Sequence, residues 1–524
     1  MTDASPPVAA PSVRAASLVA GGIFLSRIIG FVRDRAFAHF FGSGAAADAF
    51  NAAIRIPNIL RNLLGEGALS ASFIPVYSAS LDRANRDEAR ALANSILSLL
   101  LLATSVITIA GILLAPVITE VVATGFDPAK AALTTRLIRV LFPMTGLMVL
   151  SGWCLGIQNS HRLFFNSYAS AALWSLAQIA LLVWWGPQAD TLEQLAWWLA
   201  WATIAGALLQ IAAQLPQVLP RVWPIVLRIR ASPPVLETLR NFVPVVTALG
   251  LFQISSLIDL QIASWLPEGA VANLSYAQRL YLLPVSLFGI SVAAAALPEL
   301  SRESAAVARD ALTTRVRDGW VRILFYIVPT AVAFVVLGDL IVGLVYRSGR
   351  FGADEQHIVH VILAAYALGL IGFSSVKLVA SAFYAMQDYR TPLRAALVSI
   401  VVGTATSITI ALSLRHSPYG AAGLAVSASL GSYVNLSILA GALRRRLGAL
   451  YTPAMWKGTW RIVGASLLAG AVAYPVRWLL ADQHVALAAV ATLPLFGVVF
   501  LAAAHHAGSG EAGRLLRRLH LIRR

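Results

Sequence analysis

The chain has 524 residues, of which 58% are hydrophobic and only 12% are charged, and its mean hydropathy is +0.75. Because a soluble domain is about one quarter charged, this composition excludes most classes of soluble protein. The single cysteine, Cys154, excludes an internal disulfide framework and a four-cysteine metal site.

Residues 1–14 show no signal-peptide pattern, and we expect them to form a disordered cytoplasmic tail. The rest of the chain contains recurring apolar runs of about twenty residues, the length that crosses a hydrocarbon core of roughly 30 Å. We therefore predict an all-α polytopic membrane protein with about fourteen transmembrane helices. The predicted helices cover residues 15–41, 46–80, 91–120, 132–157, 163–185, 194–216, 241–265, 272–301, 319–345, 358–386, 395–414, 420–443, 462–476 and 486–507.

Basic residues are distributed unevenly over the connections between these helices. One alternate set of connections, which includes both termini, holds 25 of the 40 Lys and Arg residues. The opposite set holds five, namely Lys130, Arg347, Arg350, Arg415 and Arg477. Cytoplasmic connections carry the excess of positive charge in membrane proteins, so we expect both termini in the cytoplasm. The same rule accounts for the net charge of +16 without nucleic acid.

Ten further basic residues fall inside predicted helices, where each costs on the order of 2.5–3.5 kcal/mol at the helix centre. Five of them lie too deep for snorkelling to explain easily. We expect these five to line a water-filled cavity: Arg27, Arg55, Arg61, Arg279 and Lys377. Lys377 fits a structural salt bridge as well as a functional role. Because guanidinium groups bind phosphate oxygens in a bidentate manner, the arginines favour a phosphate or pyrophosphate ligand.

Acidic residues share helix faces with two of these arginines. Arg27 and Asp34 are seven residues apart, as are Asp48 and Arg55, so each pair lies on one side of its helix. Proline and glycine residues then interrupt the second helix, and broken helices are tolerated in membranes where they line a cavity or are buried in protein. We expect Glu66, within this broken stretch, and Asp34 to pair with arginines when the cavity is empty.

The sequence contains an internal repeat with a nearly constant offset. Asp34 and Asp259 are 225 residues apart, and further along IQNSHR (157–162) matches MQDYRT (386–391). We infer two parallel six-helix repeats around a central cavity, with two extra C-terminal helices outside the repeat. The predicted parts are an N-terminal lobe (15–216), a cytoplasmic linker (217–240), a C-terminal lobe (241–443), helices 13 and 14 (444–507) and a basic cytoplasmic tail (508–524).

Three stretches of sequence resemble the signatures of a known transporter family. They are SRIIGFVRDRAFAHFFGSGAAADAFNAAIRIPNILRNLLGEGALSASFIPVYS (26–78), SYAQRLYLLPVSLFGISVAAAALPELSR (275–302) and KLVASAFYAMQDYRTPLRAAL (377–397). The chain resembles the MurJ/MviN family of lipid II flippases over essentially its whole length. The resemblance implies the multidrug/oligosaccharidyl-lipid/polysaccharide exporter fold. It also implies transport of an undecaprenyl-pyrophosphate-linked disaccharide-pentapeptide to the outer leaflet for peptidoglycan synthesis.

The resemblance also implies site residues. We expect six substrate-binding residues, of which all but the last correspond to essential residues of the family: Arg27, Arg33, Arg61, Arg279, Asp48 and Arg55. An inward-open cavity would receive the pyrophosphate, and neutralisation of its charge would let the two lobes rock to an outward-open state. In relatives the two extra helices form a groove for the lipid tail, which suits the apolar spans 462–476 and 486–507.

The sequence departs from the family at a few positions. Gln278 and Leu282 stand where relatives have acidic residues near the arginine of the eighth helix. Some relatives bind sodium through acids of the eleventh helix, but residues 395–414 contain no acid, and Asp259 in the seventh helix is the remaining candidate ion site. We expect no cofactor, and protons or the membrane potential fit the sequence as a driving force at least as well as sodium does. The sequence has no G-x-x-x-x-G-K-[ST] loop for ATP hydrolysis.

Two other functions fit parts of the sequence. A related exporter would carry another polyprenyl-linked oligosaccharide, whereas a drug antiporter needs a cavity of acids and aromatics in place of excess arginine. A membrane enzyme acting on lipid-linked sugars needs clustered carboxylates or metal ligands, and the short connections contain no such cluster. We expect a monomeric transporter, not an enzyme, in the bacterial cytoplasmic (inner) membrane. Its expected partners are the lipid-linked substrate, membrane lipids and cell-wall synthases.

Overall fold

A computed structural model describes residues 13–82, 85–290, 305–448 and 452–518. These residues form helices joined by short connections, with no β-strand among them. The chain divides into two compact units, Met1–Phe41 with Ala45–Leu260, and Gly42–Gly44 with Gln261–Arg524. Most of the tail predicted to be disordered, residues 1–12, lies outside the described part of the chain.

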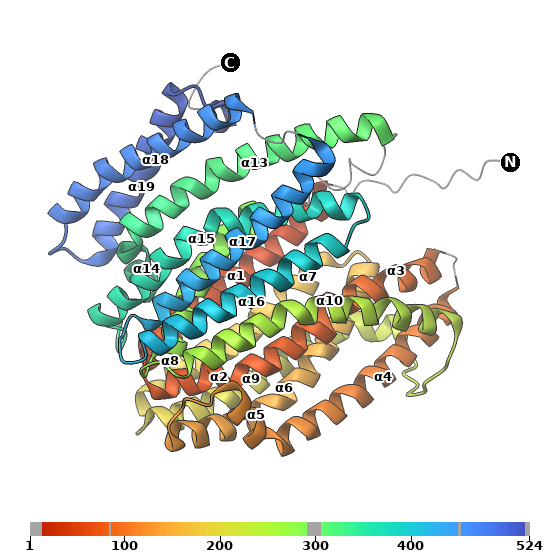
Figure 1. The fold of residues 1–524 in the computed structure, drawn as a ribbon. Coiled ribbons are helices and arrows are strands. Elements are labelled where there is room, and N and C mark those ends of the chain that lie inside the picture. Colours follow the sequence, from red (N-terminus) through yellow and green to blue (C-terminus); the bar gives the residue numbers. More distant parts are fainter. Residues whose placement is uncertain (1–12, 83–84, 291–304, 449–451, 519–524) are drawn as a thin grey trace. The chain divides into compact units, whose positions relative to one another are not determined.

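The first unit contains the helices that precede residue 260 (Figure 1). They are α1 (Val13–Phe41), α2 (Ala45–Arg61), the π-helical turn η1 (Asn62–Gly67), α3 (Ala68–Asp82), α4 (Arg86–Leu113), α5 (Ala115–Val122), α6 (Pro128–Ser160), α7 (Phe164–Ala169), α8 (Ala171–Trp185), the short η2 (Gly186–Gln188), α9 (Leu192–Val222) and most of α10 (Pro233–Ala263). Only residues 223–232 are non-helical between α9 and α10, so the connection is shorter than the predicted linker at 217–240. The unit boundary lies within α10.

The second unit begins at the end of α10. Its further helices are α11 (Ala270–Pro284), the π-helical turn η3 (Val285–Ile290), α13 (Ala305–Val336), α14 (Gly338–Tyr346), α15 (Ala353–Ala385), α16 (Arg390–Ser413), α17 (Gly420–Leu447), α18 (Pro453–Leu479), α19 (Val485–His506) and α20 (Gly510–Arg518). The two extra helices, α18 and α19, pack against each other, and α18 also packs against α13 (Figure 1). Part of the predicted basic tail is helical as α20.

Ten helices in the described part of the chain are long and apolar enough to cross a membrane. The four remaining predicted spans are α1, the α2–η1–α3 run, α10 and the α11–η3 run, which are the first two spans of each half. The prediction of an all-α membrane protein with about fourteen spans is confirmed.

The two units repeat the same local geometry. Both α2 and α11 follow a glycine, and both lead into a six-residue π-helical turn. Both α6 and α15 have 33 residues, and each is followed by a left-handed residue, Arg162 at φ 60° and Gln387 at φ 58°. The backbone N–H one position later closes the same cap, Leu163 N to Gln158 O at 2.8 Å and Asp388 N to Phe383 O at 2.9 Å.

These caps set the register of the repeat at 225 residues. The prediction that IQNSHR (157–162) matches MQDYRT (386–391) is therefore four residues out of register. The caps align 157–162 with 382–387. The letter match aligned similar side chains, but the end of a helix is set by backbone conformation, which residue similarity did not reveal.

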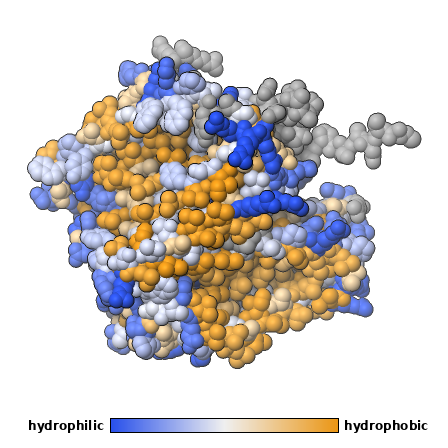
Figure 2. Space-filling view, viewed as in Figure 1, coloured by the Kyte–Doolittle hydropathy of each residue, from blue (hydrophilic) through white to orange (hydrophobic). Residues whose placement is uncertain are grey.

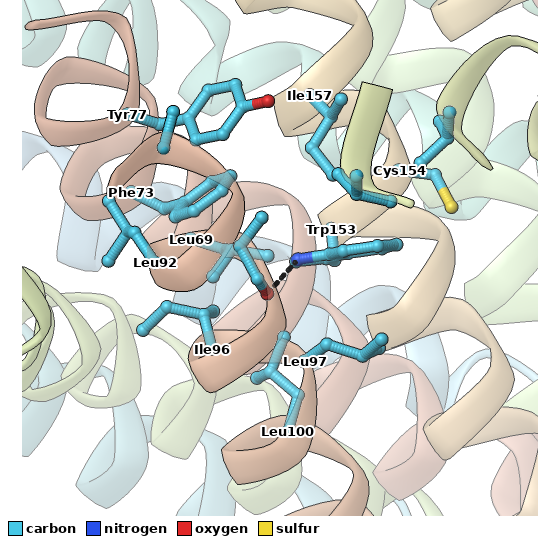
Figure 3. Packing of buried hydrophobic residues seen from close by; sticks show 14 of the residues in the cluster. Leu69, Phe73, Tyr77, Leu92, Ile96, Leu97, Leu100, Trp153, Cys154 and Ile157 are labelled. Atoms are coloured by element: carbon cyan, nitrogen blue, oxygen red, sulfur yellow. Dashed lines mark hydrogen bonds between the residues drawn. The ribbon is translucent and has the colours of Figure 1, made fainter. Parts of the chain in front are cut away.

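The core of the first unit lies where α3 and α4 pack on α6 (Figure 3). Phe73 and Tyr77 of α3 stack with ring centroids 5.1 Å apart. The buried indole of Trp153 donates from Nε1 to the Ala93 carbonyl at 3.1 Å, which satisfies its polar atom. Cys154 is 1% exposed in the same cluster, so the lone thiol is a packing group.

The outward faces of several helices are apolar. On α16 the exposed side chains include Leu397, Val398, Val401 and Leu412. Only 17% of an 18-residue apolar stretch of α16 is buried, whereas 72% of the corresponding stretch of α6 is buried. Hydrophobic side chains cover much of the face shown in Figure 2. A surface this apolar suits hydrocarbon, so α16 faces lipid while α6 is a central helix of its unit.

Candidate functional site

Two of the predicted arginines lie over one aromatic ring. The guanidinium carbon of Arg33, on α1, is 4.9 Å from the centroid of the Trp174 ring on α8. That of Arg61, at the end of α2, is 5.8 Å from the same centroid. Both distances are within the roughly 6 Å range of cation–π attraction. The negative face of the indole therefore offsets part of the repulsion between two like charges, and three helices are joined at this point.

Arg33 also has polar partners. Its Nη2 and Nε donate to Asp34 Oδ1 at 2.8 and 3.1 Å, and its Nη1 lies 3.4 Å from the Ser175 hydroxyl. Asp34 is buried, with 6% of its surface exposed. A buried carboxylate requires a charged partner, and the adjacent guanidinium supplies it. Asp34 therefore pairs with an arginine.

Arg61 is less well satisfied. It lies where α2 changes into the π-helical turn, and its Nη2 donates to Asn62 Oδ1 at 3.4 Å. Within the described part of the chain, Arg61 Nε and Trp174 Nε1 are buried and have no hydrogen-bond partner. A buried donor without an acceptor costs about 1–3 kcal/mol. The cluster of Arg33, Arg61, Trp174 and Ser175, here called the arginine–tryptophan cluster, thus carries positive charge and donors that an anion would satisfy.

Asp48 lies in a different environment. It is 1% exposed, and its Oδ2 is 3.5 Å from Nζ of Lys130, whose side chain is 8% exposed. The ammonium also lies 4.6 Å from the centroid of the Phe126 ring. Sequence analysis assigned Lys130 to an external connection, but α6 begins at Pro128 because Asp127 accepts a hydrogen bond from the Lys130 N–H at 3.0 Å. Asp48 therefore forms a buried ion pair between α2 and α6.

The other predicted residues of the first unit are more scattered. Arg27 is exposed on α1, and Arg55 is half-buried on α2. The positive charge of Arg55 interacts electrostatically with Asp259 of α10. Glu66 belongs to the π-helical turn, but its side chain lies outside the described residues.

In the second unit, Arg279 is half-buried on α11 and Lys377 is exposed on α15. Gln278 donates from Nε2 to the Tyr366 hydroxyl at 3.0 Å, and Tyr366 stacks on Tyr281 at 4.8 Å between centroids. This hydrogen bond links the Gln278 side chain of α11 to α15. Leu282, the other departure noted from the sequence, is 52% exposed.

The profile of the family described as lipid II flippase MurJ matches residues 37–495. This chain belongs to that family. A lipid II flippase MurJ of Burkholderia cenocepacia (strain J2315) is 32% identical over 464 residues, which cover 87% of this chain and 88% of the relative.

Solved structures show the same fold. One titled "Lipid II flippase MurJ, inward closed conformation" has a TM-score of 0.75 at 22% identity, and the match covers 96% of this chain and 99% of that one. An inward-facing multidrug resistance MATE family transporter of the MOP superfamily has a TM-score of 0.66 at 16% identity, covering 83% of this chain and 98% of its own. The MurJ family assignment and the exporter fold expected from the sequence are confirmed.

Three residues of the site were not predicted for this MurJ family member. Trp174 and Ser175 lie in the interior of an apolar helix, where a tryptophan far from the interfacial pair Trp184 and Trp185 was an available signal. Lys130 is one of only three lysines among the basic residues. Its proximity to the Asp127–Pro128 helix start was the available signal, since that start places it in the first turn of a buried helix.

Proposed function

We propose that this protein flips lipid II, the undecaprenyl-pyrophosphate-linked peptidoglycan precursor, from the cytoplasmic to the outer leaflet for cell-wall synthesis. The observation that carries the proposal is the convergence of Arg33 and Arg61 on Trp174, with two buried donors left unsatisfied. Guanidinium groups bind phosphate oxygens with matched geometry. Membership of the MurJ family supports the identity of the cargo.

Binding follows from the charges of the arginine–tryptophan cluster. The pyrophosphate would accept hydrogen bonds from Arg61 Nε and Trp174 Nε1 and would compete with Asp34 for Arg33. Each buried donor that gains an acceptor recovers the desolvation cost it bears in the empty site. We propose that further positive charge for binding the same cargo comes from Arg27, Arg55 and Arg279. We also propose that Asp34, Glu66 and Lys377 form ion pairs when no cargo is bound.

Transport would proceed by alternating access, the mechanism of transporters that are built from two repeats. The excess of basic residues on one set of connections, 25 of 40, supports cytoplasmic termini and insertion in the bacterial cytoplasmic membrane. We propose a monomer that uses no cofactor, performs no covalent chemistry and passes its cargo to cell-wall synthases. The apolar helices α18 and α19 would accommodate the lipid tail.

The driving force proposed is a proton or the membrane potential. Residues 395–414 contain no acid, so the eleventh helix lacks the acidic ligands through which some relatives bind sodium. Transport by vesicles with an imposed potential and no sodium gradient tests this proposal, since dependence on sodium would contradict it.

The main test is complementation of a strain depleted of its own lipid II flippase. Wild type, Arg33→Ala, Arg61→Ala and Arg415→Ala would be compared at matched membrane levels, with outer-leaflet lipid II measured directly. Arg415 is exposed and hydrogen-bonds to its neighbour His416, so it is a control for loss of one arginine. We expect rescue by wild type and the control, and loss of export in both site variants.

Two outcomes would contradict the proposal. Inserted wild type that fails to rescue would favour export of another polyprenyl-linked oligosaccharide. Rescue by both Arg33→Ala and Arg61→Ala would exclude the arginine–tryptophan cluster as the pyrophosphate site.

A further inference from the structure

A cavity of about 370 Å³ lies in the first unit, between α1, α3, α6, α7, α8 and α9. The side chains on its wall are mostly uncharged hydrogen-bonding groups, and no acidic or basic residue lines it. They include the hydroxyls of Ser26, Ser70, Ser151, Ser167 and Tyr168 and the amide of Gln210. This cavity, here called the serine cavity, plays no part in the anion binding described above.

Hydrogen bonds hold part of the wall in place. Gln210 Nε2 donates to Ser151 Oγ at 2.8 Å, and Ser151 Oγ donates to Gln214 Oε1 at 2.9 Å. Gln214 Nε2 in turn donates to Ser170 Oγ at 3.0 Å. These hydrogen bonds hold the hydroxyl and amide groups of the wall in fixed orientations. Their remaining hydrogen-bonding capacity is available to a polar ligand.

The serine cavity adjoins the arginine–tryptophan cluster along two helices. On α1, the lining residue Ser26 is seven positions before Arg33, so both lie on one helix face. On α8, the lining residue Ala171 is three and four positions before Trp174 and Ser175, so all three lie on one helix face. A group attached directly to a phosphate held at the cluster would thus be close to the cavity.

The chemistry of the wall selects the kind of occupant. Hydroxyl and amide groups without a charge match the hydroxyl and acetamido groups of a sugar, whereas an ion would remain uncompensated. The cavity volume falls within the roughly 300–1,000 Å³ of small-molecule sites. We propose that the serine cavity binds the sugar bonded to the pyrophosphate of the cargo. This inference rests on the proposed function and deepens it.

The arrangement would make recognition depend on two subsites. The arginine–tryptophan cluster binds any polyprenyl pyrophosphate, with or without a sugar. The serine cavity adds affinity only when a sugar is present, so it discriminates the finished precursor from the bare carrier lipid. A buried polar wall that lacks its partner disfavours the wrong ligand more strongly than an apolar wall does.

The test compares binding of bare undecaprenyl pyrophosphate and of lipid II to the purified full-length protein in lipid nanodiscs. The variants are Ser26→Phe and Ser70→Phe, which fill the cavity from two different helices. Ser26 Oγ donates only within its own helix, to the Ile23 carbonyl at 2.9 Å. The matched control is Ser413→Phe, because Ser413 is exposed on α16 and also donates within its own helix, to Thr409 at 2.9 Å.

We expect wild type and the control to prefer lipid II by about ten-fold or more, the value of two or three added hydrogen bonds. Both filling variants should lose this preference while binding the bare lipid within about two-fold of wild type. Filling variants that keep the full preference would overturn the inference and leave the cavity to water. Wild type that binds neither lipid would overturn the proposed function and this inference with it.

Discussion

Variants of the buried ion pair between Asp48 and Lys130 can show whether Asp48 stabilises the fold or binds the substrate. The two charged atoms are 3.5 Å apart, and the side chains are 2% and 8% exposed. Lys130→Met removes the ammonium and leaves the buried Asp48 carboxylate without this positive charge beside it. Loss of one member of a buried pair costs about 3–5 kcal/mol. We expect a loss of stability of that size, with reduced export as a consequence of less folded protein.

The double variant Asp48→Asn/Lys130→Met decides the role of the acid. Replacing both charges with neutral groups of similar volume is close to neutral for stability, so unfolding should return to within about 1 kcal/mol of wild type. We expect export to return as well, because Asp48 is buried in an ion pair with Lys130. Thermal unfolding of purified protein and complementation at matched membrane levels measure both quantities.

Two results would refute this reasoning. A Lys130→Met variant as stable as wild type would show that the pair does not stabilise the fold. A stable double variant without export would show that Asp48 contacts the cargo, as the resemblance to the family implies.

Three further predictions concern separate features. Trp174→Leu should lower affinity for a polyprenyl pyrophosphate about five-fold to ten-fold by removing the cation–π platform, whereas Trp174→Phe should keep much of it, and equal losses in a binding assay would contradict this. Gly269→Ala should destabilise the protein more than Gly448→Ala in thermal unfolding, since both glycines have φ above 80° but only at Gly269 would a Cβ collide with the Ser43 carbonyl. The pKa of Asp388 is lowered from 3.8 to about 2, mainly because a neighbouring threonine donates hydrogen bonds from its hydroxyl and its backbone N–H, and more weakly because of an arginine. The stabilising effect of the Asp388 carboxylate is therefore present above pH 3.8 and lost as the pH falls toward 2. Asp388→Asn should remove that pH dependence from the unfolding curve, and an unchanged curve would count against it.

Much of the fold could be predicted because a membrane imposes strong constraints on sequence. Apolar runs and the distribution of arginine in the connections predicted the helices, since every span must satisfy its backbone internally and avoid charge at the lipid face. The constant offset between Asp34 and Asp259 predicted the repeat. Register at the helix ends was less accessible, because the left-handed residues that close α6 and α15 are Arg162 and Gln387, neither of which is a typical C-cap residue.

The site was only partly predictable. Arg61 was a candidate because charge inside a span is rare and costly, and Asp34 because of its helix spacing from Arg27. Arg33 was identified only through the family resemblance. Spacing within one helix cannot reveal which residue of a different helix lies opposite, so Trp174 and Lys130 were missed. Contacts between helices depend on tertiary packing, and no local pattern in a single sequence encodes them.

The π-helical turn after Arg61 is a point at which α3 can rotate about its axis relative to α2. An α-helix turns each successive residue by about 100°, so absorbing the one extra residue of a π turn rotates everything beyond it by that angle. In this protein such a change would swing all of α3 about its axis relative to α2. The second half has a matching π-helical turn, η3, directly after α11. The turn after Arg61 is thus a point at which side chains of α3 can exchange a cavity-facing position for a protein-facing one.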